Sequence, residues 1–212
     1  MLKKILTMIL AFGAIAFAGM ASADEAPDAL VKRISYEVLD TAKADKDIQG
    51  GNQKKVLELV EAKILPHIDF QKMTALAAGR YWREATPEQQ KRLGEEFRSL
   101  LVYTYSGAIS QVRDQKVEFK PLRSTPTDNE VEVRSQVIQP RGEPIQLNYR
   151  LEKQATGWKI YDVNVLGAWL VESYKSSFST EISKNGVDGL IKVLSEKNKR
   201  LAAAAAKPAK AS

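Results

Sequence analysis

The chain has 212 residues, no cysteine, one histidine and a formal net charge of +6. This composition excludes a disulfide-stapled scaffold, a zinc site built from several histidines or cysteines, and a Cys–His nucleophile. The charge is concentrated at the carboxyl end, because residues 192–212 carry a net +5 and residues 24–191 a net −1, so we expect no nucleic-acid partner.

The first 23 residues have the pattern of a secretory signal peptide. Two lysines precede an apolar run over residues 5–18, and Ala-Ser-Ala at residues 21–23 supplies the small residues of a cleavage site. The apolar run is shorter than the roughly 20 residues that a membrane-spanning helix needs. We therefore expect residues 1–23 to be cleaved and the mature protein to be exported to the periplasm of a Gram-negative cell.

The next part of the chain predicts helices. Apolar residues recur with helical spacing over residues 27–47 and again over residues 53–64. Asp69 can cap a third helix, which Gly79 ends. Residues 24–80 could therefore form a helical subdomain.

A capping box begins the clearest helix of the sequence. Thr86 is placed at the N-cap, Pro87 follows at the first helical position, and Gln89 can reach back to the cap. The apolar residues that follow stay on one helical face as far as Val112. We expect one long helix from Pro87 to Val112.

Four strands are expected after this helix, over residues 117–122, 130–139, 145–153 and 158–165. The middle two alternate between apolar and polar side chains, which is typical of an antiparallel meander with one wet face. The fourth has apolar groups at both parities. Simple alternation puts Trp158 and Ile160 on one side and Tyr161, Val163 and Val165 on the other.

Helix returns after Gly167, is interrupted at Asn185-Gly186, and ends with a short helix near Leu194. The predicted fold class is α+β: a four-stranded curved antiparallel sheet wrapped by about six to eight helices, cone-shaped and NTF2-like, enclosing an apolar cavity. We expect one domain over residues 24–198. The basic, alanine-rich tail over residues 199–212 is expected to be disordered.

Catalytic motifs are scarce in this chain. It has no G-x-S-x-G, no phosphate-binding glycine loop and no dinucleotide fingerprint. One acid–base alternative uses Asp162 with Tyr149 or Tyr161 inside the cone. We expect no enzyme, no metal and no cofactor.

Several motifs, in this order, resemble the MlaC/toluene-tolerance family of periplasmic phospholipid carriers. The resemblance covers nearly the whole mature chain. The motifs are Asp69-Phe70-x-x-Met73, Ala78-Gly79-Arg80-Tyr81-Trp82-Arg83, Thr86-Pro87-Glu88-Gln89-Gln90, Phe97-Arg98-x-Leu100-Leu101-x-x-Thr104-Tyr105, Trp158-Lys159-Ile160-Tyr161-Asp162-Val163, Tyr174-x-x-x-Phe178 and Gly186-Val187-Asp188-Gly189-Leu190-Ile191.

The resemblance implies a soluble, monomeric carrier that maintains outer-membrane lipid asymmetry. Its implied partners are a phospholipid, an outer-membrane lipoprotein–porin complex and an inner-membrane ABC transporter with an MCE-domain subunit. Exposing two acyl chains to water would cost on the order of 20 kcal/mol, so a carrier must shield them. The alternative is a binding protein or chaperone for another hydrophobic ligand or a polypeptide.

Strand parity and helix periodicity predict the wall of the cavity. Its expected acyl-chain residues are Leu101, Tyr105, Val133, Val137, Leu147, Tyr149, Tyr161, Val163, Val165, Trp169 and Leu170. The phosphate headgroup is expected near Arg80, Arg134, Lys159 or Lys175. Trp169 replaces a small residue found in many family members, so it is expected to alter the mouth or the length of the cavity.

Overall fold

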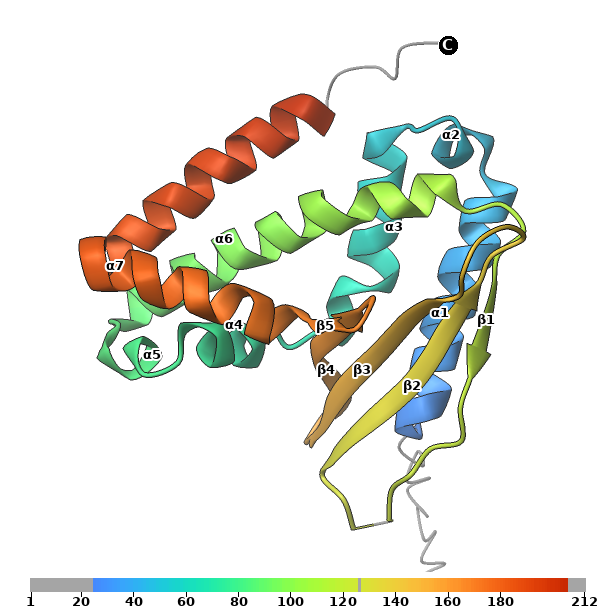
Figure 1. The fold of residues 1–212 in the computed structure, drawn as a ribbon, viewed down its shortest axis with the longest axis horizontal. Helices are drawn as coiled ribbons and strands as arrows, with labels where there is room; N and C mark the ends of the chain where they lie inside the picture. Colours follow the sequence, from blue (N-terminus) through green and yellow to red (C-terminus); the bar gives the residue numbers. More distant parts are fainter. Residues whose placement is uncertain (1–24, 126, 206–212) are drawn as a thin grey trace, which may run out of the picture.

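The structure is a computed structural model that describes residues 25–125 and 127–205. The predicted signal peptide and residues 206–212 of the predicted tail lie outside the described residues. Helices and an antiparallel sheet of five strands, in the order β1-β2-β3-β4-β5, form the fold. The predicted α+β class is confirmed, with one more strand than expected (Figure 1).

Polar caps set the limits of several helices in the first part of the chain. The helix predicted over residues 27–47 divides at Asp45, whose carboxylate accepts hydrogen bonds from the backbone N–H of Asp47 and Ile48 at 2.8 and 3.1 Å. Asp69 caps the helix that begins at Phe70 as predicted, and Gly79 ends this helix with a φ of 60°. The elements are α1 (Pro27–Ala44), α2 (Lys46–Gln49), α3 (Gln53–Lys63), the 3₁₀ helix η1 (Leu65–His67), α4 (Phe70–Ala78) and α5 (Tyr81–Glu84).

The capping box is confirmed, but the helix that it begins is shorter than predicted. Thr86 Oγ1 accepts from Gln89 N at 3.2 Å, and Gln89 Oε1 accepts from Thr86 N at 3.0 Å. α6 spans Pro87–Tyr105 and then tightens into the 3₁₀ helix η2 (Ser106–Gln111). Gly107 and the β-branched Ile109 lower the helix propensity of this segment.

The sheet is an antiparallel meander of neighbouring strands. Its strands are β1 (Lys116–Phe119), β2 (Glu130–Ile138), β3 (Ile145–Gln154), β4 (Gly157–Val165) and β5 (Ala168–Trp169). The unexpected fifth strand has two residues and follows a tight turn at Leu166-Gly167. Both turn residues have positive φ angles, 54° and 89°, as a type I′ hairpin turn requires.

A β-bulge changes which residues share a face of β4. Arg150 pairs with Asp162 whereas Leu151 pairs with Ile160, so Tyr161 is the extra residue. Ile160 and Val163 therefore lie on the same face of the sheet. The prediction that Tyr161 shares a face with Val163, opposite Ile160, is wrong because simple alternation does not pass through a bulge.

Two apolar clusters meet beside the sheet. α1 covers the apolar face of the sheet with Leu30, Val31 and Ile34, whereas α4, α6 and α7 form a helical cluster around Phe97 and Phe178, whose rings are 5.0 Å apart. Figure 1 shows α1 behind the strands and the helical cluster beside them. Within the described ranges, no helix combines the length and apolar character needed to cross a membrane.

The last helix, α7 (Leu170–Ala205), runs further than expected. The predicted interruption is confirmed at Gly186, where φ is 71° and ψ is 179°. The predicted disorder is wrong for residues 199–205, which are helical. Asn198 Nδ2 donates to Glu96 O at 2.8 Å and Leu201 packs on the helical cluster, which attaches this end of α7 to α6.

We expect Gly186→Ala to lower the free energy of unfolding by about 1–3 kcal/mol, because the backbone there occupies a region open almost only to glycine. Thermal unfolding followed by circular dichroism measures the effect. Gly107→Ala is the matched control, since Gly107 lacks a positive φ and an added Cβ would meet no atom within 4 Å. Equal melting temperatures for the two variants would contradict the kink at Gly186.

Candidate functional site

The apolar face of the sheet gathers most of the predicted wall. The register places Val133 opposite Tyr149 and Tyr149 opposite Val163, and it places Leu147 opposite Val165. Because alternate residues of a strand share a face, these side chains project to one side. The predicted wall residues on this face are Val133, Val137, Leu147, Tyr149, Val163 and Val165.

Most of these side chains are only partly buried, although they are apolar. Val133 is 1% exposed, but Val137, Leu147, Tyr149, Val163 and Val165 are half-buried. Val163 packs against both the sheet cluster and the helical cluster, and Val165 packs against the helical cluster. The junction of the two clusters therefore offers apolar surface that the protein itself does not fully cover.

The helices supply three further predicted wall residues. Leu101 of α6 and Leu170 of α7 are buried in the helical cluster, at 7% exposure each. Tyr105 is 39% exposed at the end of α6 and lies beside Tyr174, whose pKa burial raises to about 12. Burial likewise raises the pKa of Tyr149 to about 12, so both phenols are neutral at physiological pH.

The structure does not bring Tyr161 and Trp169 to this face. The bulge turns Tyr161 toward Lys72 Nζ, which lies 4.0 Å from the ring centroid and pairs with Glu130 and Glu152 at 2.5 and 2.9 Å. Trp169 pairs with Asn164 on the polar face. Trp169 therefore lies on the face of the sheet opposite the apolar wall, and not on the cavity side where it was expected.

Asp162 connects the sheet to the start of α7. It is 1% exposed, and its Oδ1 accepts from Val163 N at 2.9 Å and from Val171 N at 3.1 Å. Its Oδ2 lies 3.5 Å from an Arg150 nitrogen. Burial raises the pKa of Asp162, while these two backbone donors and Arg150 oppose the shift.

This arrangement gives no support to the acid–base alternative. Tyr149 pairs with Val163 and faces away from Asp162, which pairs with Arg150. Both carboxylate oxygens of Asp162 are engaged by backbone donors or by Arg150. The contacts of Asp162 are those of a residue that fixes the chain path.

Sequence reasoning missed a group of buried polar residues on β2, β3 and β4. Ser135 Oγ donates to Leu147 O, Asn148 Oδ1 accepts from Ser135 N at 3.2 Å, and Asn164 Oδ1 accepts from Gly167 N at 3.0 Å. Alternation over residues 145–153 predicts a solvated face for Asn148, so it gives no signal of the burial of this residue. The Asn164-x-x-Gly167 spacing is the one local sign of a side chain that supports a turn.

The four predicted headgroup residues are not gathered into one cluster. Each bonds to a different segment: Arg80 to the Tyr81 hydroxyl at 2.9 Å, Arg134 to Pro121 O at 3.4 Å, Lys159 to Pro66 O at 2.7 Å, and Lys175 to Glu172 at 3.4 Å. Arg134 and Lys159 also pair with Asn148 and Glu152, on the face opposite the apolar wall.

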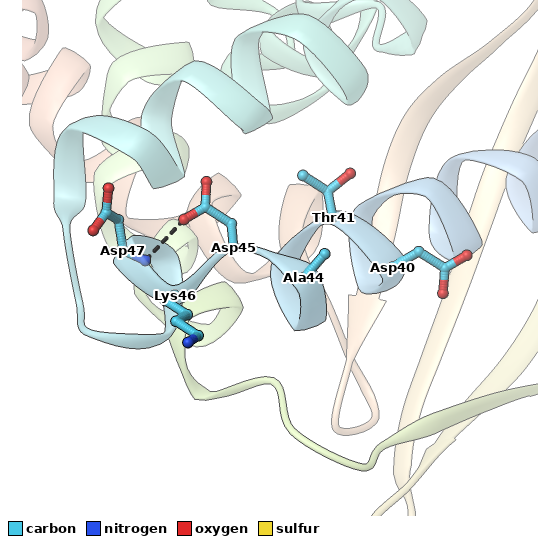
Figure 2. Close-up of a pocket in the computed structure, with 6 residues that line it drawn as sticks. All are labelled: Asp40, Thr41, Ala44, Asp45, Lys46 and Asp47. Atoms are coloured by element: carbon cyan, nitrogen blue, oxygen red, sulfur yellow. Dashed lines mark hydrogen bonds between the residues drawn. The ribbon is translucent and has the colours of Figure 1, made fainter.

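Two surface hollows lie away from the predicted wall. One, of about 680 Å³, is lined by Asp40, Thr41, Ala44, Asp45, Lys46 and Asp47 where α1 meets α2 (Figure 2). The other, of about 840 Å³, lies between the α2–α3 connection, Tyr103 and the end of α7. Most residues that line the two hollows are charged or polar, unlike the mostly apolar residues that line a typical pocket for an apolar ligand.

Comparison with known proteins identifies the family. The family model described as MlaC protein matches residues 32–196. The chain belongs to the MlaC family. The resemblance seen in the sequence motifs is thereby confirmed.

Several MlaC relatives extend this comparison. The chain is 26% identical to the intermembrane phospholipid transport system binding protein MlaC of Haemophilus influenzae, over 77% of this chain and 81% of the relative. It is 25% identical to the toluene tolerance protein ttg2D of Pseudomonas putida, over 82% and 80%. A solved phospholipid-binding protein of Ralstonia solanacearum, in complex with a phospholipid, is 49% identical, with a TM-score of 0.79 over 85% of this chain and 99% of that one.

Proposed function

We propose that this protein binds a phospholipid by its acyl chains and carries it through the periplasm. The observation that carries the proposal is the Ralstonia solanacearum protein, which shares 49% of its sequence and holds a phospholipid. A carrier of this kind needs an apolar surface and no catalytic group.

The junction of the two apolar clusters is the proposed acyl-chain site. Tyr149, Val163 and Val165 pack against one or both clusters and are half-buried, and the half-buried Leu147 lies opposite Val165 on the same face. Burying each methylene of an acyl chain contributes roughly 0.8 kcal/mol. An apolar surface left partly open by the protein can therefore be covered by the ligand.

The proposed transport links two membranes. The Haemophilus influenzae relative is described as the binding protein of an intermembrane phospholipid transport system. The partners that the family resemblance implies, and that we propose here, are an outer-membrane lipoprotein–porin complex and an inner-membrane ABC transporter with an MCE-domain subunit. Transport between them would maintain outer-membrane lipid asymmetry, and the predicted signal peptide would deliver the protein to the periplasm.

Mass spectrometry of the purified mature protein tests this function. Extraction with organic solvent after purification without detergent should release phospholipid in near-stoichiometric amount. A protein that is folded by circular dichroism and releases no phospholipid would refute the proposal. Recovery of a polypeptide or another hydrophobe in its place would favour the binding-protein or chaperone alternative.

A further inference from the structure

The turn between β4 and β5 presents an apolar side chain to solvent. Leu166 is 72% exposed, more than the other large hydrophobic residues identified as exposed. Its φ is 54°, and in the part of the chain that the structure describes no other non-glycine residue has a positive φ. Two independent features therefore set Leu166 apart from ordinary surface leucines.

Leucine is a poor choice for this position by both conformation and exposure. The first central residue of a type I′ turn is usually Asn, Asp or Gly, because a Cβ crowds the backbone when φ is positive. The conformation is nevertheless fixed, since Leu166 N donates to Gln146 O at 3.1 Å and Asn164 Oδ1 accepts from Gly167 N at 3.0 Å. A strained, exposed apolar residue on a supported turn points to a contact outside the molecule.

The residues behind the tip are arranged in a recognisable order. Trp169 pairs with Asn164, two residues from the tip, and Arg150 pairs with Asp162, four residues from it. These steps correspond to about 7 and 13 Å along the strand. The Arg150 guanidinium carbon lies 3.8 Å from the centroid of the Trp169 ring, so the two side chains stack on the same face.

An apolar tip, then an aromatic ring, then a cation is the order of groups that a bilayer surface favours. Hydrocarbon accepts leucine, the interfacial layer favours tryptophan, and phosphate headgroups attract arginine. Arg150 is available for this contact because its side chain is 39% exposed despite its pairing with Asp162.

We propose that the β4–β5 turn inserts Leu166 into the hydrocarbon of a phospholipid bilayer, with Trp169 at the interface and Arg150 at the headgroup phosphates. The proposal rests on the proposed lipid-carrier function, because Val165, the residue before the tip, lies on the proposed acyl-chain wall. β5 lies where the strands meet the helical cluster (Figure 1). Insertion would thus bring the wall to the bilayer at which a lipid is loaded or released.

Tryptophan quenching by brominated phospholipid tests the insertion. Trp82→Phe and Trp158→Phe leave Trp169 as the fluorophore of this three-tryptophan chain. Vesicles of equal parts phosphatidylethanolamine and phosphatidylglycerol, with bromine on the acyl chains, should quench Trp169. In this background Leu166→Asn should weaken vesicle binding about tenfold, the effect of withdrawing one leucine from hydrocarbon.

The same substitution should raise the melting temperature by about 2–4 °C, because asparagine tolerates the left-handed backbone. Leu166→Met keeps the apolar tip and should keep vesicle binding. Leu76→Asn is the matched control, since Leu76 is an exposed leucine that belongs to α4 and not to the turn.

Vesicle binding by Leu166→Asn equal to that of its parent would overturn the proposal. Loss of binding to a membrane-protein complex, without any vesicle effect, would also overturn it and assign Leu166 to a protein contact. Mass spectrometry of the same samples separates this test from the lipid-carrier function. A protein that retains phospholipid but shows no Trp169 quenching refutes the insertion alone.

Discussion

Leu147→Glu is expected to reduce the phospholipid recovered with the purified protein at least about tenfold, while the protein remains folded. Leu147 is half-buried on the apolar face, opposite Val165. In the empty protein a carboxylate there can stay hydrated, but a bound acyl chain would remove its water. Burying an unpaired carboxylate costs several kcal/mol, and each 1.4 kcal/mol is a factor of ten in affinity.

Gln146→Glu provides the matched control. Gln146 is the neighbouring residue of β3, is exposed and projects from the opposite face, so it introduces the same charge away from the wall. Lipid extracted from both variants is quantified by mass spectrometry, with circular dichroism as the check on folding. Wild-type lipid content in a folded Leu147→Glu protein would show that the acyl chains lie elsewhere.

Val163 is a less suitable position for this test, because it packs in both clusters and a charge there would destabilise the fold.

Local signals predicted the limits of several helices. The Thr86 capping box, the Asp69 cap and the Gly79 stop each depend on groups within a few residues of one another, so the sequence contains their whole cause. The end of α7 differs, because the residues that attach it are distant in sequence. Asn198 bonds to Glu96, which no reading of the alanine-rich tail alone could predict.

The candidate site shows the same division between local and long-range causes. Alternation placed Val133, Leu147 and Tyr149 on one face correctly, because period-two geometry operates within a strand. The positions of Tyr161 and Trp169 depend on a bulge between β3 and β4 and on a two-residue hairpin. Both features are properties of strand pairing, which alternation within one strand does not report.

Asp162→Ala is expected to lower the free energy of unfolding by about 2–4 kcal/mol, because it leaves the Val163 and Val171 amides without their acceptor. Asp162→Asn keeps an oxygen at that position and loses the charge. Its expected change is within about 1 kcal/mol, since the Arg150 partner is partly exposed at 3.5 Å. Urea unfolding followed by circular dichroism measures both variants. If Asp162→Asn lowers the free energy of unfolding as much as Asp162→Ala does, the charge of Asp162, and not its acceptor oxygen, stabilises the start of α7.

The pH dependence of the free energy of unfolding, compared between wild type and Asp162→Asn, further separates the role of the Asp162 charge from that of its acceptor oxygen. The pKa of Asp162 is raised in the folded protein above its ordinary value of 3.8, so the folded state binds this proton before the unfolded state does. As pH falls from neutrality through the raised pKa toward 3.8, this group therefore adds to the stability of the wild type. Asp162→Asn cannot bind the proton, so its stability relative to wild type should decline over that range. If Asp162 acts as an acceptor, the free energies of unfolding of wild type and Asp162→Asn should be nearly equal at neutral pH and differ more in acid. If a buried charge stabilises the fold, the larger difference should occur at neutral pH and the smaller one in acid.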